Sequence, residues 1–171
     1  MAIKKERLET KLGRRGFTLI EILIVVAIIA ILASVVLVGL GPTQRQGRDA
    51  RRISDLQQIQ NGLELYFNHC GWYPGGANCS AWSTTNGGSN AAFVSMGTAL
   101  TGTSAIGVPT VPNDPTNVAP YQYEYASASA NSYTLAATLE DANNAALRNS
   151  IHSSNSNGVD CSASSTYCIS L

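Results

Sequence analysis

The feature that most constrains this chain is a long apolar run close to its N-terminus. From Phe17 to Leu40 there are 24 residues, and between Ile22 and Val38 only Ser34 is not apolar. As a helix, this stretch is about 36 Å long, enough to cross a hydrocarbon core of about 30 Å with some tilt. A soluble domain of this size rarely holds a helix that is apolar on every side. The run therefore predicts a membrane-spanning helix rather than a buried core helix.

The sixteen residues before this run differ in charge from the rest of the chain. The other 155 residues carry five arginines, nine acids and no lysine, and the formal net charge of the whole is zero. The first sixteen carry two acids and six basic residues: Lys4, Lys5, Arg7, Lys11, Arg14 and Arg15. Because basic residues beside a membrane helix favour the cytoplasmic side, we expect this leader to stay in the cytoplasm.

A secretory signal peptide is the main alternative for a basic segment followed by an apolar one. The apolar part of a signal peptide has about 7–15 residues, which is shorter than the run seen here. The run also contains a carboxylate, Glu21, near its start. A charged group at membrane depth is costly, so Glu21 calls for a functional reason that a signal peptide does not supply.

The residues around Glu21 resemble a known processing signal. The pattern is a basic pair, a glycine, an aromatic residue and a glutamate four positions later, Arg14-Arg15-Gly16-Phe17-Thr18-Leu19-Ile20-Glu21. It is similar to the cleavage and N-methylation motif of the type IV pilin family, which includes true pilins and the pseudopilins of type II secretion. The resemblance implies that a prepilin peptidase cuts between Gly16 and Phe17 and methylates the new amine of Phe17. Arg14 and Arg15 then belong to the removed leader, while the apolar helix stays in the product.

Glu21 gains a chemical partner if this cut is made. Cleavage creates a cationic α-amine on Phe17, one helical turn before the carboxylate. That amine is in reach of Glu21 in the same chain, and in a stack of helices it can meet the Glu21 of a neighbouring subunit. We therefore expect Glu21 to act in assembly rather than in catalysis, because a paired buried charge also sets register. The alternative is a glutamate that only extends to the lipid headgroups.

The helical pattern continues beyond the membrane segment. Gly39, Gly41 and Pro42 interrupt it and predict a kink. Apolar residues then recur every three or four positions, at Ile53, Leu56, Ile59, Leu63 and Phe67. This spacing predicts an amphipathic helix with one buried face, which carries the whole helix to a length of about 78 Å.

Four arginines fall within this amphipathic segment, and three of them are expected on a face other than the apolar one. We expect Arg45, Arg48 and Arg52, with Asp49 and Asp55 nearby, to form a solvated or intersubunit side of the helix. Their position does not indicate a nucleic-acid site.

Residues 69–171 predict a polar head. The part from Cys79 to Gly107 is expected to be loop, with a short helix near 91–100. Alternating patterns at 121–125 and 133–139 predict a β-hairpin, and 167–171 a third strand. We expect these tyrosine-rich strands to pack on the helix rather than to form a ligand platform. The fold class is therefore α+β: a long N-terminal helix, half membrane and half amphipathic, packed against a small antiparallel sheet, as in pilins.

The chain thus divides into four expected parts. These are a cleaved leader at 1–16, a transmembrane and assembly helix at 17–40, its amphipathic continuation at 41–68, and the head at 69–171. The four cysteines all lie outside the membrane segment, and an exported location favours disulfides. Four cysteines permit three pairings, of which the short loops favour Cys70–Cys79 and Cys161–Cys168.

We assign no cofactor and no metal site from the sequence. The segment 112–123 is similar to that of major type II secretion pseudopilins, and the resemblance implies calcium in the loop after the hairpin. Here that loop reads Leu139-Glu140-Asp141-Ala142-Asn143-Asn144. Its oxygen ligands suit calcium in kind, but the family's aspartate spacing is not reproduced. His69 and His152 stand apart from any zinc-like spacing.

These features favour a structural filament subunit, either of a type II secretion pseudopilus or of a type IV pilus. We find no nucleophile–base pattern and expect no enzyme activity. No nucleic acid is expected either, because the head has one arginine against five acids. Expected partners are other pilin subunits, the prepilin peptidase, an inner-membrane assembly platform and the lipid bilayer. The expected location is the bacterial inner membrane, with the head outside the cytoplasm, and then the filament. The alternative is a membrane-anchored binding domain or enzyme whose leader only resembles the motif.

Overall fold

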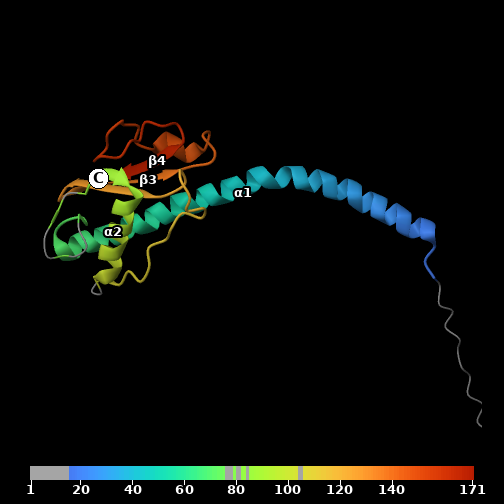
Figure 1. Cartoon of the computed structure of the whole chain (residues 1–171), viewed down its shortest axis with the longest axis horizontal. Coiled ribbons are helices and arrows are strands. Elements are labelled where there is room, and N and C mark those ends of the chain that lie inside the picture. The colour runs from blue at the N-terminus through green and yellow to red at the C-terminus, as the bar shows by residue number, and fades with distance from the viewer. Residues whose placement is uncertain (1–15, 76–78, 80–81, 84, 104–105) are drawn as a thin grey trace, which may run out of the picture. The chain divides into compact units, whose positions relative to one another are not determined.

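The computed structural model describes residues 16–75, 79, 82–83, 85–103 and 106–171. The predicted leader, with Arg14 and Arg15, lies outside these residues apart from Gly16. The chain forms two compact units, one ending at Gly41 and one running from Pro42 to Leu171. Helix α1 (Leu19–Cys70), drawn in Figure 1, runs through the boundary. Pro42 lies inside this helix.

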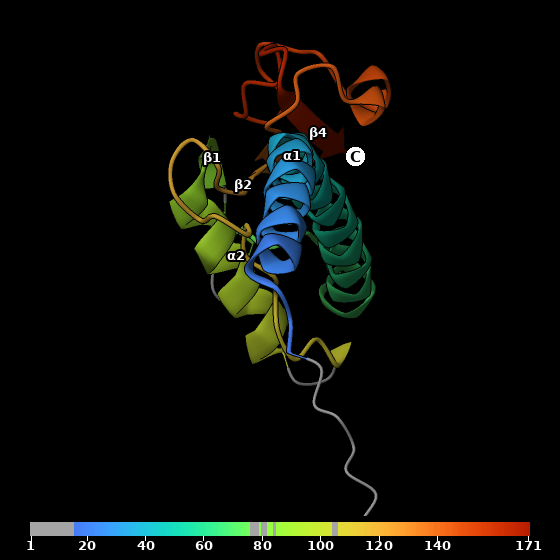
Figure 2. The ribbon, with the colours of Figure 1, turned by 90° about the vertical axis from the view of Figure 1, so that its right-hand side faces the viewer.

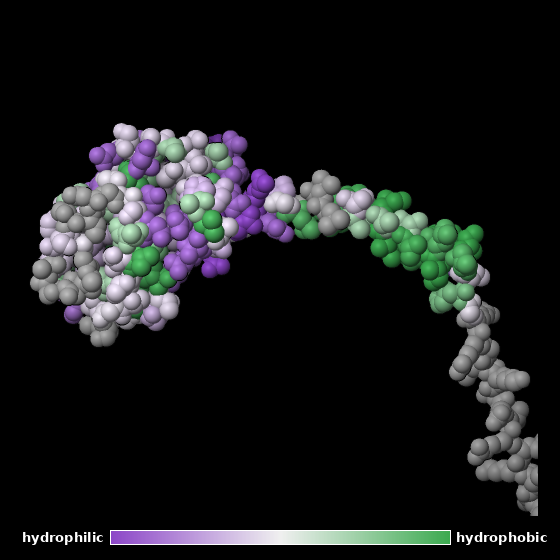
Figure 3. All heavy atoms as spheres, in the orientation of Figure 1, coloured by the Kyte–Doolittle hydropathy of each residue, from purple (hydrophilic) through white to green (hydrophobic). Residues whose placement is uncertain are grey.

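The described part of the first unit is the apolar part of α1. Residues Leu19–Val36 have a mean hydropathy of 3.1 and are long and apolar enough to span a membrane. None of the side chains in this span is buried, and Figure 3 shows the segment as a hydrophobic surface. Ser34, its one polar residue past Glu21, donates its hydroxyl to the carbonyl of Ile31 at 2.7 Å. The polar group is thus satisfied inside the helix, as a lipid environment requires.

The second unit is built around the amphipathic part of α1. The predicted apolar face is confirmed, since Leu56, Ile59 and Leu63 are fully or almost fully buried. Ile53 and Phe67 pack at the margin of the same core. This face meets the sheet and a second helix through aromatic and aliphatic side chains: Tyr66, Phe93, Met96, Leu100, Tyr123, Tyr125, Tyr133 and Leu135. The tyrosines of the hairpin are therefore core residues, as the strand pattern predicted.

The sheet has four antiparallel strands in the order β1-β2-β3-β4. They are β1 (Thr85–Ser89), β2 (Glu124–Ser129), β3 (Ser132–Thr138) and β4 (Thr166–Ser170). The predicted hairpin and third strand are confirmed, with Tyr125 opposite Leu135 and Leu135 opposite Ile169. The first strand of the hairpin covers Glu124–Ser129, however, and not the predicted 121–125. Strand β1 corrects the prediction of a loop. Its sequence, Thr-Asn-Gly-Gly-Ser, carries no alternating apolar pattern, and its pairing with β2 shifts register between Thr85 and Ser89.

Helix α2 (Asn90–Gly102) follows β1 directly and confirms the short helix expected near 91–100. Ser89 caps it by accepting a hydrogen bond from the amide of Ala92 at 3.1 Å. The helix packs against β1 and β2, as Figure 2 shows.

The opposite face of the sheet is covered by residues 142–165, which we call the C-terminal strap. It includes the short helix η2 (Ala145–Asn149). Ala126, Ala136 and Cys168 of the strands point to this face, because side chains alternate along a strand. They pack with Val159 and Cys161 of the strap in a second, smaller core.

The strap also contacts both outer strands of the sheet. The amide of Cys168 donates to the hydroxyl of Ser150 at 2.8 Å, and the amide of Ile151 donates to the carbonyl of Cys168 at 3.4 Å. At the other edge the amide of Gly88 donates to the carbonyl of Gly158 at 2.8 Å.

Candidate functional site

The predicted processing residues stand at the start of α1. Gly16 is exposed, and the side chain of Phe17 is 82% exposed. Among the described residues beyond its chain neighbours, an added Cβ on Gly16 would meet no atom within 4 Å. The bond between Gly16 and Phe17 is therefore open to an approaching protease.

Glu21 takes part in a capping box with Thr18. The amide and hydroxyl of Thr18 both donate to Oε2 of Glu21, at 2.8 and 2.7 Å. In return the amide of Glu21 donates to the hydroxyl of Thr18 at 3.3 Å. This reciprocal pair satisfies donors that the first turn of a helix otherwise leaves free. Glu21 thus caps the N-terminal end of α1, where cleavage would create the new amine of Phe17. The Thr18-x-x-Glu21 spacing is the sequence signal of this cap.

The four cysteines form two disulfides. The structure joins Cys70, the last residue of α1, to Cys79, and joins Cys161 of the strap to Cys168 of β4. The second disulfide lies in the smaller core, where both cysteines are buried.

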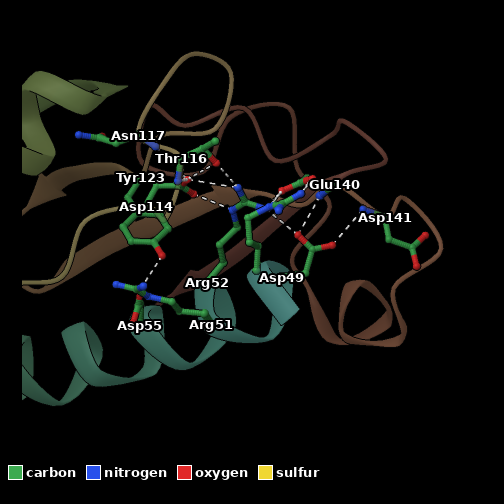
Figure 4. Close-up of polar contacts among 11 residues, drawn as sticks. Asp49, Arg51, Arg52, Asp55, Asp114, Thr116, Asn117, Tyr123, Glu140 and Asp141 are labelled. Carbon is green, nitrogen blue, oxygen red and sulfur yellow. Dashed lines mark hydrogen bonds and ion pairs between the residues drawn. The ribbon is translucent and has the colours of Figure 1, made fainter. Parts of the chain in front are cut away.

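Arg52 corrects the expectation of a solvated arginine side. Its side chain has no exposed surface at all. Figure 4 shows the guanidinium between α1 and two loops of the head. The donors Nε and Nη2 bind the two carboxylate oxygens of Asp114, at 2.6 and 3.2 Å. Nη1 binds Asp49 at 2.8 Å and Glu140 at 2.9 Å, and Nη2 also donates to the hydroxyl of Thr116 at 2.7 Å.

Arg48 extends this cluster toward the solvent. Its Nε and Nη2 donate to the two oxygens of Glu140, both at 2.6 Å. Arg51 remains largely exposed, 3.6 Å from Asp55, and Asp55 also accepts a hydrogen bond from the hydroxyl of Tyr123 at 2.8 Å. Of the three arginines expected on a solvated side, only Arg45 is fully exposed.

The position of Arg52 has a sequence signal that the charge pattern hid. Arg52 is four residues before Leu56, which is followed by Ile59 and Leu63 at the same helical spacing. It therefore belongs to the buried face, and a buried arginine requires acids nearby. Asp49, one turn earlier on α1, is such an acid. Asp114 and Glu140 come from distant parts of the chain, and no local pattern places them.

Electrostatics in this cluster favour the charged forms. Hydrogen bonds from Arg48, with smaller contributions from Arg52, lower the pKa of Glu140 to about 2. Burial by itself would raise the pKa of Asp114, but hydrogen bonds from Arg52 and from the amides of Thr116 and Asn117 lower it overall. Burial opposes the charge of Arg52, yet its carboxylate partners raise the pKa of the guanidinium further. The cluster is therefore a set of ion pairs at neutral pH.

The loop for which the resemblance implies calcium belongs to this cluster. Both oxygens of Glu140 bind guanidinium groups, and the amides of Glu140 and Asp141 donate to Asp49 at 2.9 and 3.0 Å. One oxygen of Asp141 accepts the amide of Asn143 at 2.9 Å. Among residues with a described placement, no group of three His, Cys, Asp or Glu side chains is arranged to hold a metal ion. The donors of this loop do not fit calcium, because Arg48 and Arg52 already bind the carboxylate of Glu140.

Comparison with known proteins agrees with the site at the start of α1. The family model described as the prokaryotic N-terminal methylation motif matches residues 11–37. Curated relatives include proteins named type II secretion system core protein G. The one from Escherichia coli (strain K12) is 38% identical over 53 residues, which are 31% of this chain and 37% of that protein. The one from Aeromonas hydrophila is 34% identical over 56 residues, 33% of this chain and 39% of that protein.

The chain thus spans less than two-fifths of the length of these curated relatives. No solved structure matches it significantly. The motif match nevertheless covers the Gly16–Phe17 bond and Glu21 as well as most of the apolar span. The chain therefore carries the prokaryotic N-terminal methylation motif of prepilin-type proteins on a pilin-like α+β fold.

Proposed function

We propose that this chain is a structural filament subunit, assembled through its N-terminal helix into a type II secretion pseudopilus. The observation that carries the proposal is the methylation motif at residues 11–37 leading into the apolar span Leu19–Val36, none of which is buried within the chain itself. Such a surface requires either lipid or other apolar helices around it. A filament subunit uses both in turn, first in the membrane and then in the polymer.

Processing is the first step of this proposal. A prepilin peptidase cuts between Gly16 and Phe17 on the cytoplasmic side and methylates the amine of Phe17. The basic leader holds that end of the chain in the cytoplasm. The head, with its two disulfides, then lies outside the cytoplasm, where disulfides persist.

Assembly is the second step. The subunit leaves the inner membrane through contacts with an assembly platform and joins other pilin-like subunits. The amine of an incoming Phe17 meets a neighbour's Glu21, whose carboxylate is exposed at the helix start. The names of the relatives, all core protein G of type II secretion, favour a pseudopilus over a type IV pilus.

Intact-protein mass spectrometry tests the processing step. In a host that contains a prepilin peptidase, the mature protein should begin at Phe17 and carry one added methyl group. Gly16→Leu should abolish the cut, because the side chain obstructs the scissile bond, and the precursor should accumulate in the membrane. Gly13→Leu is a matched control in the same leader and should be cut normally.

Two results would contradict the proposal. One is a mature protein that retains Met1, and the other is a product that begins near Ser34, as after a signal-peptide cut. Either would support the anchored-domain or signal-peptide interpretation instead.

A further inference from the structure

We propose that Arg52 is the structural cation of this head, so that a side chain performs the task that a bound divalent cation performs in other carboxylate clusters. The inference concerns the closure of the head and is independent of the filament proposal. It follows from the convergence of three carboxylates from three separate segments on one buried guanidinium.

The first step of the argument is the geometry of the contacts. Asp49 comes from α1, Asp114 from the segment before β2, and Glu140 from the loop after β3. A guanidinium has five N–H donors in a fixed plane. Arg52 makes five hydrogen bonds of 2.6 to 3.2 Å, four to these carboxylates and one to Thr116. Its donors are therefore fully used, as those of a well-coordinated cation would be.

The second step is the charge balance. Asp49 and Asp114 are both buried, and the side chain of Glu140 is only 11% exposed. Three carboxylates this close together repel one another strongly unless a cation lies among them. Arg48 neutralises Glu140 from the solvent side, which leaves Arg52 as the cation that Asp49 and Asp114 share. The ring of Tyr121 covers the guanidinium, with its centroid 4.8 Å from Cζ.

The third step is what the cation holds in place. Asp49 accepts Nη1 of Arg52 on one oxygen and the amides of Glu140 and Asp141 on its two oxygens. Asp114 accepts Arg52 together with the amides of Thr116 and Asn117. Arg52 thus fixes the loop after β3 and the segment before β2 to the same turn of α1. A calcium ion in a carboxylate loop has the same effect, but here the cation is covalently attached and cannot be chelated.

Melting of the unaltered protein gives the first test. The full-length chain in detergent is heated in excess calcium and, separately, in excess EDTA. We expect the same Tm in both, because the carboxylates are already saturated by arginines. A Tm that calcium raises, or that EDTA lowers, would overturn the proposal.

Removal of the guanidinium gives the second test. Arg52→Ala leaves Asp49, Asp114 and the Thr116 hydroxyl around an empty volume, beside a Glu140 that Arg48 still binds. The freed oxygen atoms suit calcium in kind. We expect the Tm of this variant in EDTA to fall by more than about 10 °C, and calcium to restore part of the loss. Arg51→Ala is the matched control, since it removes an adjacent but exposed arginine. It should change the Tm little and should not respond to calcium.

Two outcomes of this comparison would overturn the proposal: an Arg52→Ala protein that folds but gains nothing from calcium, or equal gains in both variants. If Arg52→Ala does not fold, Arg52→Lys decides. Lysine keeps the charge with fewer donors in a less fixed geometry, so it should fold with a reduced Tm that calcium leaves unchanged. A lysine variant that calcium stabilises, or one that also fails to fold, would show that the positive charge at this position is not what closes the head.

Discussion

Glu21 closes a capping box in the structure and has a second interaction in the filament that we propose. Its carboxylate closes the capping box with Thr18, and its charge is the natural partner for an amine on Phe17. A glutamine at this position would keep the first interaction and lose the second, because its amide oxygen still accepts the Thr18 amide. The two contributions can therefore be measured separately.

We expect both Glu21→Ala and Glu21→Gln to insert in the membrane and to be cut after Gly16, since neither changes the leader or the scissile bond. Both should lose filament yield by more than about tenfold, because the amine of each added subunit stays unpaired. The measurement is the amount of sheared filament at equal membrane levels of subunit. Normal filaments from Glu21→Gln would assign the role to the cap, and normal filaments from Glu21→Ala would remove the assembly role altogether.

Glu140 gives the head a defined dependence on acid. Its pKa is lowered from an ordinary value of 4.5 to about 2, first by hydrogen bonds from Arg48 and then by Arg52. A carboxylate with a lowered pKa in the folded state stabilises the fold above its unfolded pKa, and this stabilisation is lost as pH falls. We therefore expect the Tm to drop between about pH 4.5 and pH 2.

Thermal melts across this pH range check the prediction. Glu140→Gln should have a lower Tm at neutral pH and a shallower decline in acid, because one of the titrating groups is gone. A decline of equal slope in the two proteins would assign the acid sensitivity to other carboxylates, of which Asp114 is the next with a lowered pKa.

At the scale of elements, the C-terminal strap depends on its disulfide more than on its own packing. It contains one short helix, and its apolar contribution to the second core is small side chains such as Val159 and Cys161. The main core around Leu63 and Tyr133 is formed mostly by other elements, and the strap adds to it only Leu147 and Ala146 of η2. The strap is therefore expected to be released without loss of the main fold.

We expect Cys161→Ser with Cys168→Ser to lower the free energy of unfolding by roughly 2–3 kcal/mol, the value for closing a loop of this length. Urea denaturation measures the loss, and near-ultraviolet circular dichroism should show that the tyrosine core is retained. Non-reducing peptide mapping of the unaltered protein should recover Cys161 with Cys168 and Cys70 with Cys79. A peptide that joins Cys70 to Cys161 or Cys168 would contradict both the pairing and the strap.

At the scale of the whole molecule, local patterns predicted most of the elements and few of the contacts between them. The helix at 19–70, the hairpin and the fourth strand all follow from apolar periodicity that is read along the chain. Strand β1 was not predicted, because its glycines and asparagine form no apolar pattern and only the pairing with β2 makes the segment a strand. The burial of Arg52 was not predicted, because a charged residue is expected at the surface unless the acids that pair with it are known. Two of those acids lie more than 60 positions away in the sequence.

The contacts of the strap with the outer strands bear on how heads of this fold behave when they are crowded together. Ser150 and Ile151 occupy the outward backbone groups of Cys168, and Gly158 occupies that of Gly88. These hydrogen bonds occupy part of each outer edge, and a covered edge pairs less readily with strands from other molecules. In the filament that we propose, heads crowded together in the membrane would then have fewer free strand groups through which to pair edge to edge.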